Sequence, residues 1–295
     1  MNIADEIKKS FKSGSALIKL IYINLAVFLA VKIIEVIFFL LNISPIFSII
    51  NWLAVPADFH NLIYKPWTII TYMFLHQGFM HILFNILWLY WFGQIFLRYF
   101  DDKKLLSVYL VGGIAGAALY ILSFNLLPVF NQVLPVSYAL GASASVIAIV
   151  IAVSVYAPNH TINLMFFGPV QLKYIAIVTI VIDILSIASS NAGGHIAHLG
   201  GALFGYLYIS QLRKGKNITK GFDHFMDKIF SLFKPKQKFK VTYKRPMTDI
   251  EKDIDYNKTQ AAKQEDIDKV LDKIAKSGYD SLTKKEKEVL FSNNK

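Results

Sequence analysis

Residues suited to acyl transfer occur in three strongly apolar segments of this sequence. His81 and Asn85 are four residues apart, so on a helix they share one face. Ser143 and His198 follow in two later segments. A serine hydroxyl can act as a nucleophile and an imidazole as its general base, while a second imidazole and an amide can donate hydrogen bonds to an oxyanion. Together these residue types indicate a hydrolase with a serine nucleophile.

The composition indicates that these segments lie in a membrane. The chain has 295 residues, of which 55% are hydrophobic and 17% charged, whereas a soluble chain carries about 25% charge. Between Leu105 and Leu212 only Lys173 and Asp183 are charged. No water-soluble surface can be built over such a stretch, so we predict a multi-pass membrane protein. The absence of cysteine excludes disulfides, cysteine-bound zinc and thiol catalysis.

Six apolar segments are the elements that must position the candidate residues. Several of them approach the ~20 residues that a membrane-spanning helix needs. The fifth is short, and the first contains Lys32 and Glu35, which are three residues apart and able to pair on one helix face. The sequence predicts an all-α membrane protein, a bundle of six transmembrane helices at about 17–41, 78–97, 105–125, 139–157, 171–188 and 194–212.

Basic residues in the connections predict the orientation of this bundle. The odd-numbered connections, at about 42–77, 126–138 and 189–193, contain one basic residue, Lys65. The even-numbered connections and the two termini contain many more. Because connections rich in lysine and arginine stay on the cytoplasmic side, we expect both termini to be cytoplasmic. An even number of spans requires the same arrangement.

This orientation brings the candidate residues to one depth. The second, fourth and sixth segments all run from the outer side inward. Ser143 is expected about four residues into the fourth segment, or ~6 Å at 1.5 Å per residue. His198 is about as deep in the sixth segment, and His81 and Asn85 lie in the same outer third. Polar residues inside a membrane are costly and mark functional sites.

Three motifs contain these residues: His76-Gln-Gly-Phe-Met-His81-Ile-Leu-Phe-Asn85, Gly141-Ala-Ser143, and Ala197-His198-Leu-Gly-Gly201-Ala-Leu-Phe-Gly205. These motifs resemble those of the rhomboid family of intramembrane serine proteases in their order, in their internal spacing and in the segments that contain them. The resemblance covers about residues 17–212. The resemblance implies a six-helix bundle in which Ser143 is the nucleophile and His198 the general base, without a third carboxylate. It implies that His81 and Asn85 help the Ser143 backbone amide to hold the oxyanion, and that no metal or cofactor takes part.

Two histidines compete for the role of general base. The family's histidine has glycines three and seven residues after it, as His198 has in Gly201 and Gly205, whereas His195 does not. We therefore assign His198 and interpret His195 as a polar residue at the mouth of the water cavity. The GxxxG pair also predicts close packing of the sixth segment, which a hydrogen bond between serine and histidine requires.

The sequence departs from the family pattern at three places. The residue after the nucleophile is Ala144 where glycine is usual. Ile147 stands four residues after Ser143, where some members have an aromatic residue that packs against the histidine. Trp52 in the first outer connection has no arginine beside it. The second departure leaves the support of His198 open.

Other interpretations of the candidate residues remain. Serines at 143 and 145 could be small residues at helix contacts, since serine is enriched there in membranes. Asp183, near the outer end of the fifth segment, is interpreted as a residue of the outer interface or of a gate region rather than as a triad acid. A zinc site would need a carboxylate or a fourth imidazole near the histidines, and its candidates are His76, His81, His195 and His198.

The chain after Arg213 has the composition of a soluble segment. Residues 213–245 are basic with interleaved aromatics, which suits attraction to anionic lipid, and residues 246–264 read as a flexible polar linker. A helical period follows, Gly278 ends it, and a second short helix begins at about Ser281. This end resembles a small helical segment appended to some bacterial rhomboid-like proteins. Its mixed charges argue against nucleic acid as a partner.

The sequence thus predicts four parts: a cytoplasmic N-terminus (1–16), a six-span protease core (17–212), a basic linker (213–264) and a helical C-terminal segment (265–295). The predicted function is an intramembrane serine endopeptidase of the cell membrane, the bacterial inner membrane, that cuts single-span substrates near the outer face. One alternative is an inactive rhomboid-like protein that binds transmembrane clients, and another is a histidine-based metal enzyme. A transporter would need polar residues through the whole depth of the bundle.

Overall fold

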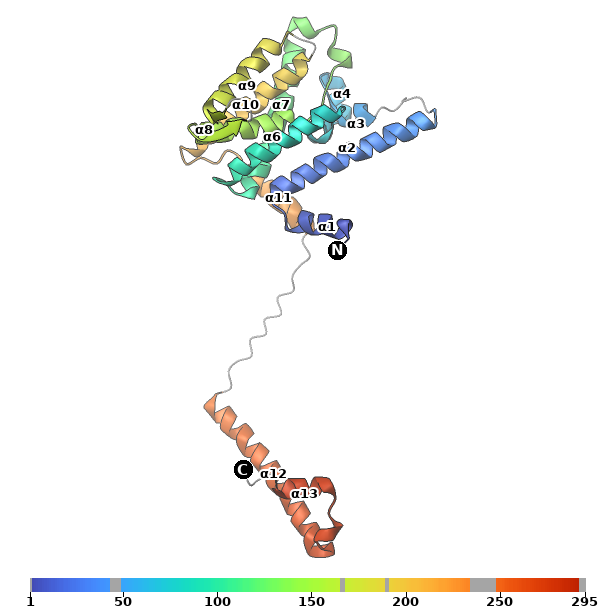
Figure 1. Ribbon diagram of the computed structural model, residues 1–295, viewed down its shortest axis with the longest axis vertical. Helices are drawn as coiled ribbons and strands as arrows, with labels where there is room; N and C mark the ends of the chain where they lie inside the picture. The colour runs from blue at the N-terminus through green and yellow to red at the C-terminus, as the bar shows by residue number, and fades with distance from the viewer. Residues whose placement is uncertain (1, 43–48, 165–167, 189–190, 234–247, 292–295) are drawn as a thin grey trace. The chain divides into compact units, whose positions relative to one another are not determined.

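The computed structural model describes residues 2–42, 49–164, 168–188, 191–233 and 248–291. The chain divides into two compact units, Met1–Lys234 and Pro235–Lys295. Both are predominantly helical, as predicted (Figure 1).

Six long helices in the first unit correspond to the six predicted segments. Among the described residues, α2, α6 and α7 are long and apolar enough to cross a membrane, and α8 is a shorter apolar helix. The six-span count remains a prediction, because α8 and α9 have only 14 and 15 residues and α10 is not among the candidate spans of the described residues. The helices are α2 (Ala16–Leu40), α6 (Phe79–Leu97), α7 (Asp102–Leu126), α8 (Ser143–Tyr156), α9 (Leu172–Ser186) and α10 (Ala192–Leu212).

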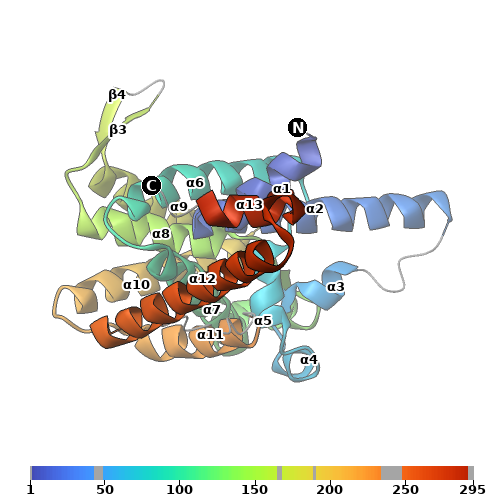
Figure 2. The ribbon, with the colours of Figure 1, turned by 90° about the horizontal axis from the view of Figure 1, so that it is seen from below.

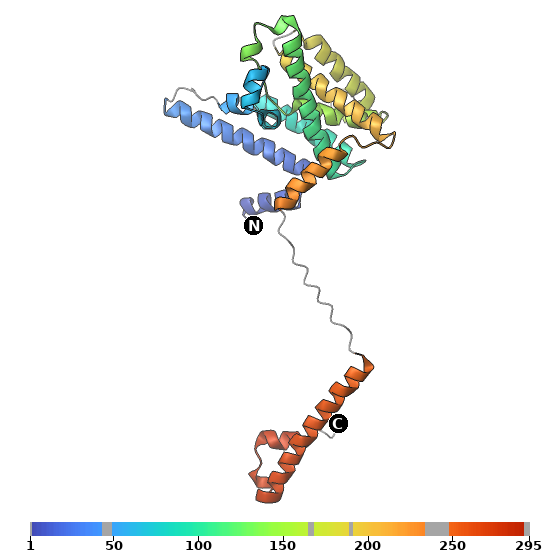
Figure 3. The same cartoon turned by 180° about the vertical axis from the view of Figure 1, so that it is seen from behind.

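Helix α8 forms the centre of the first unit. Its residues 144–154 are all buried, and α7 and α10 pack closely against it. A side chain at Gly201 or Gly205 would collide with the α8 backbone carbonyls of Ala144 and Ala148, so the predicted GxxxG pair allows this approach. Helices α2 and α9 lie on opposite flanks of the bundle (Figures 1 and 3).

The start of α8 differs from the predicted segment. Residues 138–139 form strand β2 (Tyr138–Ala139), which pairs antiparallel with β1 (Val55–Pro56). Gly141 has φ +120°, a conformation that favours glycine, and its amide donates to the Tyr72 carbonyl at 2.9 Å. The helix therefore begins only at Ser143, which lies in the first turn of α8 rather than four residues inside it.

Smaller elements occupy the connections. Strands β3 (Thr161–Leu164) and β4 (Gly168–Gln171) form a hairpin that projects from the helices (Figure 2). The N-terminal part forms a helix, α1 (Ile3–Ser13). The connection between α2 and α6 contains α3 (Ile49–Leu53), α4 (Phe59–Tyr64), α5 (Thr68–Thr71) and the 3₁₀ turn η1 (Tyr72–Phe74). The connection between α7 and α8 contains the 3₁₀ turns η2 (Pro128–Phe130) and η3 (Leu134–Val136).

The predicted basic linker at 213–264 differs from the structure at both ends. Helix α11 (Lys220–Phe233) belongs to the first unit and packs against α7. Its Asp223 accepts a 2.5 Å hydrogen bond from the Ser107 hydroxyl, and Asp227 pairs with Lys103 at 2.6 Å. The net positive charge of the segment gave no indication that two of its acidic side chains make these contacts. Positions 239 and 243, two of its aromatic residues, lie outside the described residues.

The second unit is a helical hairpin. Helix α12 (Asp249–Ser277) begins where a flexible linker was predicted, because Thr248 and Glu251 form a capping box. It ends at Gly278 (φ +76°), as predicted. After the 3₁₀ turn η4 (Tyr279–Ser281), α13 (Lys284–Phe291) returns, and Lys273 pairs with Glu286 at 2.8 Å across the hairpin.

Candidate active site

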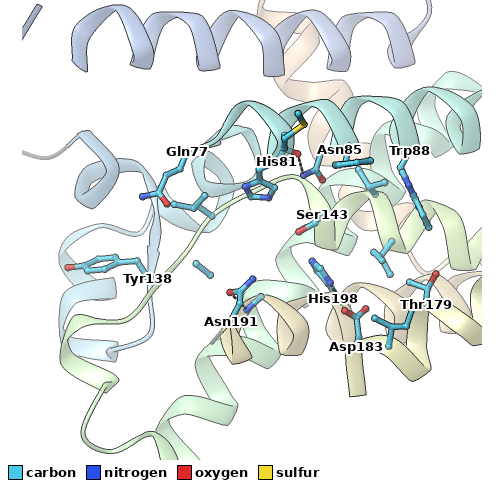
Figure 4. A pocket seen from close by; sticks show the side chains of 18 of the residues that line it. Gln77, His81, Asn85, Trp88, Tyr138, Ser143, Thr179, Asp183, Asn191 and His198 are labelled. Atoms are coloured by element: carbon cyan, nitrogen blue, oxygen red, sulfur yellow. Dashed lines mark hydrogen bonds and ion pairs between the residues drawn. The ribbon is translucent and has the colours of Figure 1, made fainter. Parts of the chain in front are cut away.

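A cavity of about 990 Å³ opens between the helices of the first unit. The four predicted site residues line it together, although they come from three helices (Figure 4). A fourth helix, α9, contributes Asp183, which was not among the predicted site residues. The predicted set is His81 and Asn85 of α6, Ser143 of α8 and His198 of α10.

Ser143 occupies a position suited to a nucleophile. It is half-buried, whereas the residues around it, 141–142 and 144–154, are buried. As the first residue of α8 it has a backbone amide with no acceptor within the helix. The N-terminus of a helix also favours negative charge. An oxyanion formed at Ser143 would therefore meet a free amide and a favourable dipole.

His81 lies beside the loop that precedes the nucleophile. A side-chain carbon at Gly141 would be 2.8 Å from His81 Nε2 and 3.7 Å from the Ser143 hydroxyl. Only glycine leaves room for the ring here. His81 Nε2 and the Ser143 hydroxyl thus both lie near Gly141, which is the placement that an oxyanion donor requires.

Asn85 is buried and lines the same cavity, but its amide makes a local contact. Its Nδ2 donates to the His81 carbonyl at 2.8 Å, within α6. This bond uses one of the two amide hydrogens and leaves the other for a ligand in the cavity.

His198 has an unexpected partner. Its Nδ1 is 2.8 Å from Asp183 Oδ1, and His195 Nδ1 is 2.8 Å from the same oxygen. Asp183 is 5% exposed, so its carboxylate does not face solvent, and the histidine does have a carboxylate beside it; its position in an outer interface or gate region stays a prediction. In Figure 4 the His198 ring lies between Ser143 and Asp183. Among the described residues no hydrogen bond joins Ser143 to His198.

The predicted zinc ligands do not come together as one set. His76 and His81 pack edge to face, with ring centroids 5.0 Å apart. The described group that could hold a metal is Asp183 with His195 and His198, whose ligand atoms lie within 4.8 Å of one another. The structure therefore supplies the carboxylate that a zinc site requires, on α9.

His76 has a role that the sequence did not indicate. It is 1% exposed, and its Nε2 accepts from the Ala142 amide at 3.4 Å while Nδ1 donates to the Phe74 carbonyl at 3.3 Å. Burial and the neighbouring His81 lower the pKa of His76 to about 4, which keeps the ring neutral and able to accept. The ring thus anchors the residue before Ser143. Its position five residues before His81 was the only signal.

Two family models match the chain. One, described as the Rhomboid domain, matches residues 64–215. The other, described as a family of unknown function (DUF6576), matches residues 250–294. The first includes all four predicted site residues, and the second coincides with the helical hairpin of the second unit.

Three curated relatives are similar to parts of the chain. RHOMBOID-like protein 12, mitochondrial, of Arabidopsis thaliana is 32% identical over 158 residues, 50% of this chain and 47% of the relative. Rhomboid protease GlpG of Pectobacterium atrosepticum is 29% identical over 105 residues, 36% and 34% of the two chains. Rhomboid-like protein 16, chloroplastic, of Arabidopsis thaliana is 27% identical over 161 residues, 50% of each. The matched region spans half or less of each relative.

Proposed function

The chain belongs to the rhomboid family, which includes serine proteases, and from that premise we propose that it is an intramembrane serine endopeptidase. One observation supports this most strongly. Ser143, in the first turn of α8, shares a single cavity with His198, His81 and Asn85. The residues come from segments far apart in the sequence, and a packing role for each would not require them to meet.

The proposed chemistry is acyl transfer in two halves. His198 takes the hydroxyl proton as Ser143 Oγ bonds to the carbonyl carbon of the scissile peptide. The carbonyl oxygen becomes an oxyanion, which the Ser143 amide, His81 and Asn85 stabilise. The C–N bond then breaks, and the proton passes from His198 to the leaving nitrogen. Water attacks the acyl-enzyme by the same route and restores the free serine.

The proposed substrates are single-span membrane proteins. All backbone groups of a membrane helix are bonded internally, so its carbonyls are hidden from attack. Cleavage therefore requires a helix that is weak near its outer end, with glycine, proline or other poor helix formers there. With six spans and both termini cytoplasmic, the cavity opens at the outer face and the cut falls at that boundary. The basic residues after Arg213 then face anionic lipid.

Substitution of the proposed nucleophile tests this function. Cleavage of a single-span substrate is measured in proteoliposomes, and the products are mapped by mass spectrometry. Ser143→Ala and His198→Ala are expected to abolish cleavage. Ser145→Ala is the matched control, because Ser145 is buried two residues later and its hydroxyl has no hydrogen-bond partner among the described residues. This variant should cleave normally. Normal turnover by Ser143→Ala would overturn the proposal.

Two further readouts separate the alternatives. EDTA should leave turnover unchanged, and inhibition by EDTA would favour a metal enzyme built on Asp183, His195 and His198. An inactive client-binding protein would retain the substrate in pull-downs without cutting it. A cut near the cytoplasmic end of the substrate would contradict the proposed topology.

A further inference from the structure

We propose that Asp183 is a positioning residue for His198, so that the site works as a serine–histidine–aspartate arrangement whose carboxylate comes from α9. This inference rests on the proposed protease function. It assigns a role to a residue for which the family pattern, a pair without a third carboxylate, provides none.

The burial of Asp183 is the first argument. Its side chain is almost inaccessible, and the only other charged residue of its host helix is Lys173 at the first turn. A carboxylate in such a place is costly unless it is hydrogen-bonded. Two imidazole N–H groups satisfy one of its oxygens at 2.8 Å each. The pairing with the histidines is therefore what makes the aspartate tolerable in α9.

The tautomer of His198 is the second argument. An ionised carboxylate can only accept, so the 2.8 Å contact requires the proton on Nδ1. A neutral ring that carries its proton on Nδ1 has its lone pair on Nε2, the atom that must take the Ser143 proton. The carboxylate also stabilises the imidazolium that forms in the transition state. Asp183 stays ionised throughout, and no proton is transferred to it.

The third argument concerns Ile147, which stands where some family members have an aromatic residue. Ile147 is 7% exposed and lines the same cavity, but an aliphatic side chain offers no ring face against which an imidazole could stack. The other direction from which His198 can be held is α9. Asp183 is the charged side chain that lines the cavity there, and its contact supplies the missing support.

His195 contacts the same carboxylate oxygen, but we expect it to contribute less to turnover. Its ring is not among the residues that line the cavity. Removal of His195 leaves the contact between His198 and Asp183 in place, whereas removal of the carboxylate leaves both rings without an acceptor at Nδ1. We therefore expect removal of the Asp183 carboxylate to lower turnover much more than removal of His195.

The test measures kcat and KM in proteoliposomes. Asp183→Asn is expected to lower kcat by about 10⁴-fold, as loss of the aspartate does in serine triads, with little change in KM. Asp183→Glu should recover part of kcat, and His195→Ala should lose less than tenfold. Asp223→Asn is the matched control, since Asp223 is the other buried aspartate of the described residues and does not line the cavity. It should lower the Tm and leave the kcat of the folded protein unchanged.

A measurement on the unsubstituted protein keeps the inference testable if Asp183→Asn does not fold. The ¹⁵N resonances of histidine, with His198 identified by its loss in His198→Ala, should report the proton on Nδ1. A ring protonated at Nε2, or a normal kcat in Asp183→Asn, would overturn the inference. If Ser143→Ala is inactive while Asp183→Asn is normal, only this inference fails; if Ser143→Ala cleaves normally, the protease proposal itself fails.

Discussion

Two aspartates are buried in the first unit, and their partners differ in kind. Asp183 on α9 accepts from two imidazoles and lines the cavity that contains Ser143. Asp223 on α11 accepts from the Ser107 hydroxyl and from Asn217 and Thr219. The first donors are imidazoles, which can serve as general bases, whereas hydroxyl and amide donors do not serve that role here. A buried carboxylate therefore indicates chemistry when its donors are candidate acid–base groups beside a nucleophile; with hydroxyl and amide donors it indicates docking of one helix on another.

Among the other residues of the cavity that contains Asp183, the largest effect is expected at the oxyanion donors. His81→Ala should lower kcat by about 10²–10³-fold, equivalent to about 2.7–4 kcal/mol, because the donor acts on charge that develops in the transition state. Asn85→Ala should follow in the same direction. Steady-state kinetics in proteoliposomes measure kcat and KM separately. A change confined to KM would mean that these residues shape the substrate site only.

An intermediate effect, on stability alone, is expected at the other aspartate. Ser107→Ala leaves Asp223 with one donor fewer in a buried place, which should lower the free energy of unfolding by about 1–3 kcal/mol. Thermal denaturation in detergent measures the loss. The kcat of the folded fraction should equal that of the unsubstituted protein, since α11 contributes nothing to the cavity. A tenfold loss of kcat would break the distinction between the two aspartates.

The smallest effect at neutral pH is expected at His76. Its pKa of about 4 in the folded protein lies below the ordinary value of 6.5, so the unfolded chain binds the proton first as the pH falls. Stability from this group is complete above about pH 6.5 and is lost progressively toward pH 4. His76→Gln keeps an acceptor for the Ala142 amide without titrating. The difference in Tm between the two proteins should therefore narrow or reverse as the pH is lowered, and a constant difference would contradict the assignment.

Much of the frame was predictable from local pattern. The apolar segments predicted α2, α6 and α7 to within a few residues, because apolar length alone sets a spanning helix. The residue types of the three motifs predicted that His81, Ser143 and His198 would meet. The two glycines of α10 predicted that this helix packs closely against a neighbour, because the signal for such packing is the local spacing of the glycines.

What escaped prediction depends on contacts between distant segments. A single aspartate in an apolar run carries no local pattern, and its role follows only from the approach of α9 to α10. The start of α8 depends on the backbone of Gly141 and on its bond to Tyr72, which an apolar run that began at 139 did not reveal. Charge counting assigned α11 to a linker, because a sum over residues does not show which carboxylate faces a hydroxyl.

The docking of α11 on α7 has a consequence for biogenesis. Ser107 leaves the ribosome long before Asp223, since 116 residues separate them. A nascent chain is made from its N-terminus, so the N-terminal end of α7 lacks its carboxylate partner until every other helix of the bundle has been synthesised. The docking of α11 on α7 is thus a late step in the assembly of the first unit. A chain released before residue 223 would present an unfinished surface to the quality-control machinery of the cell.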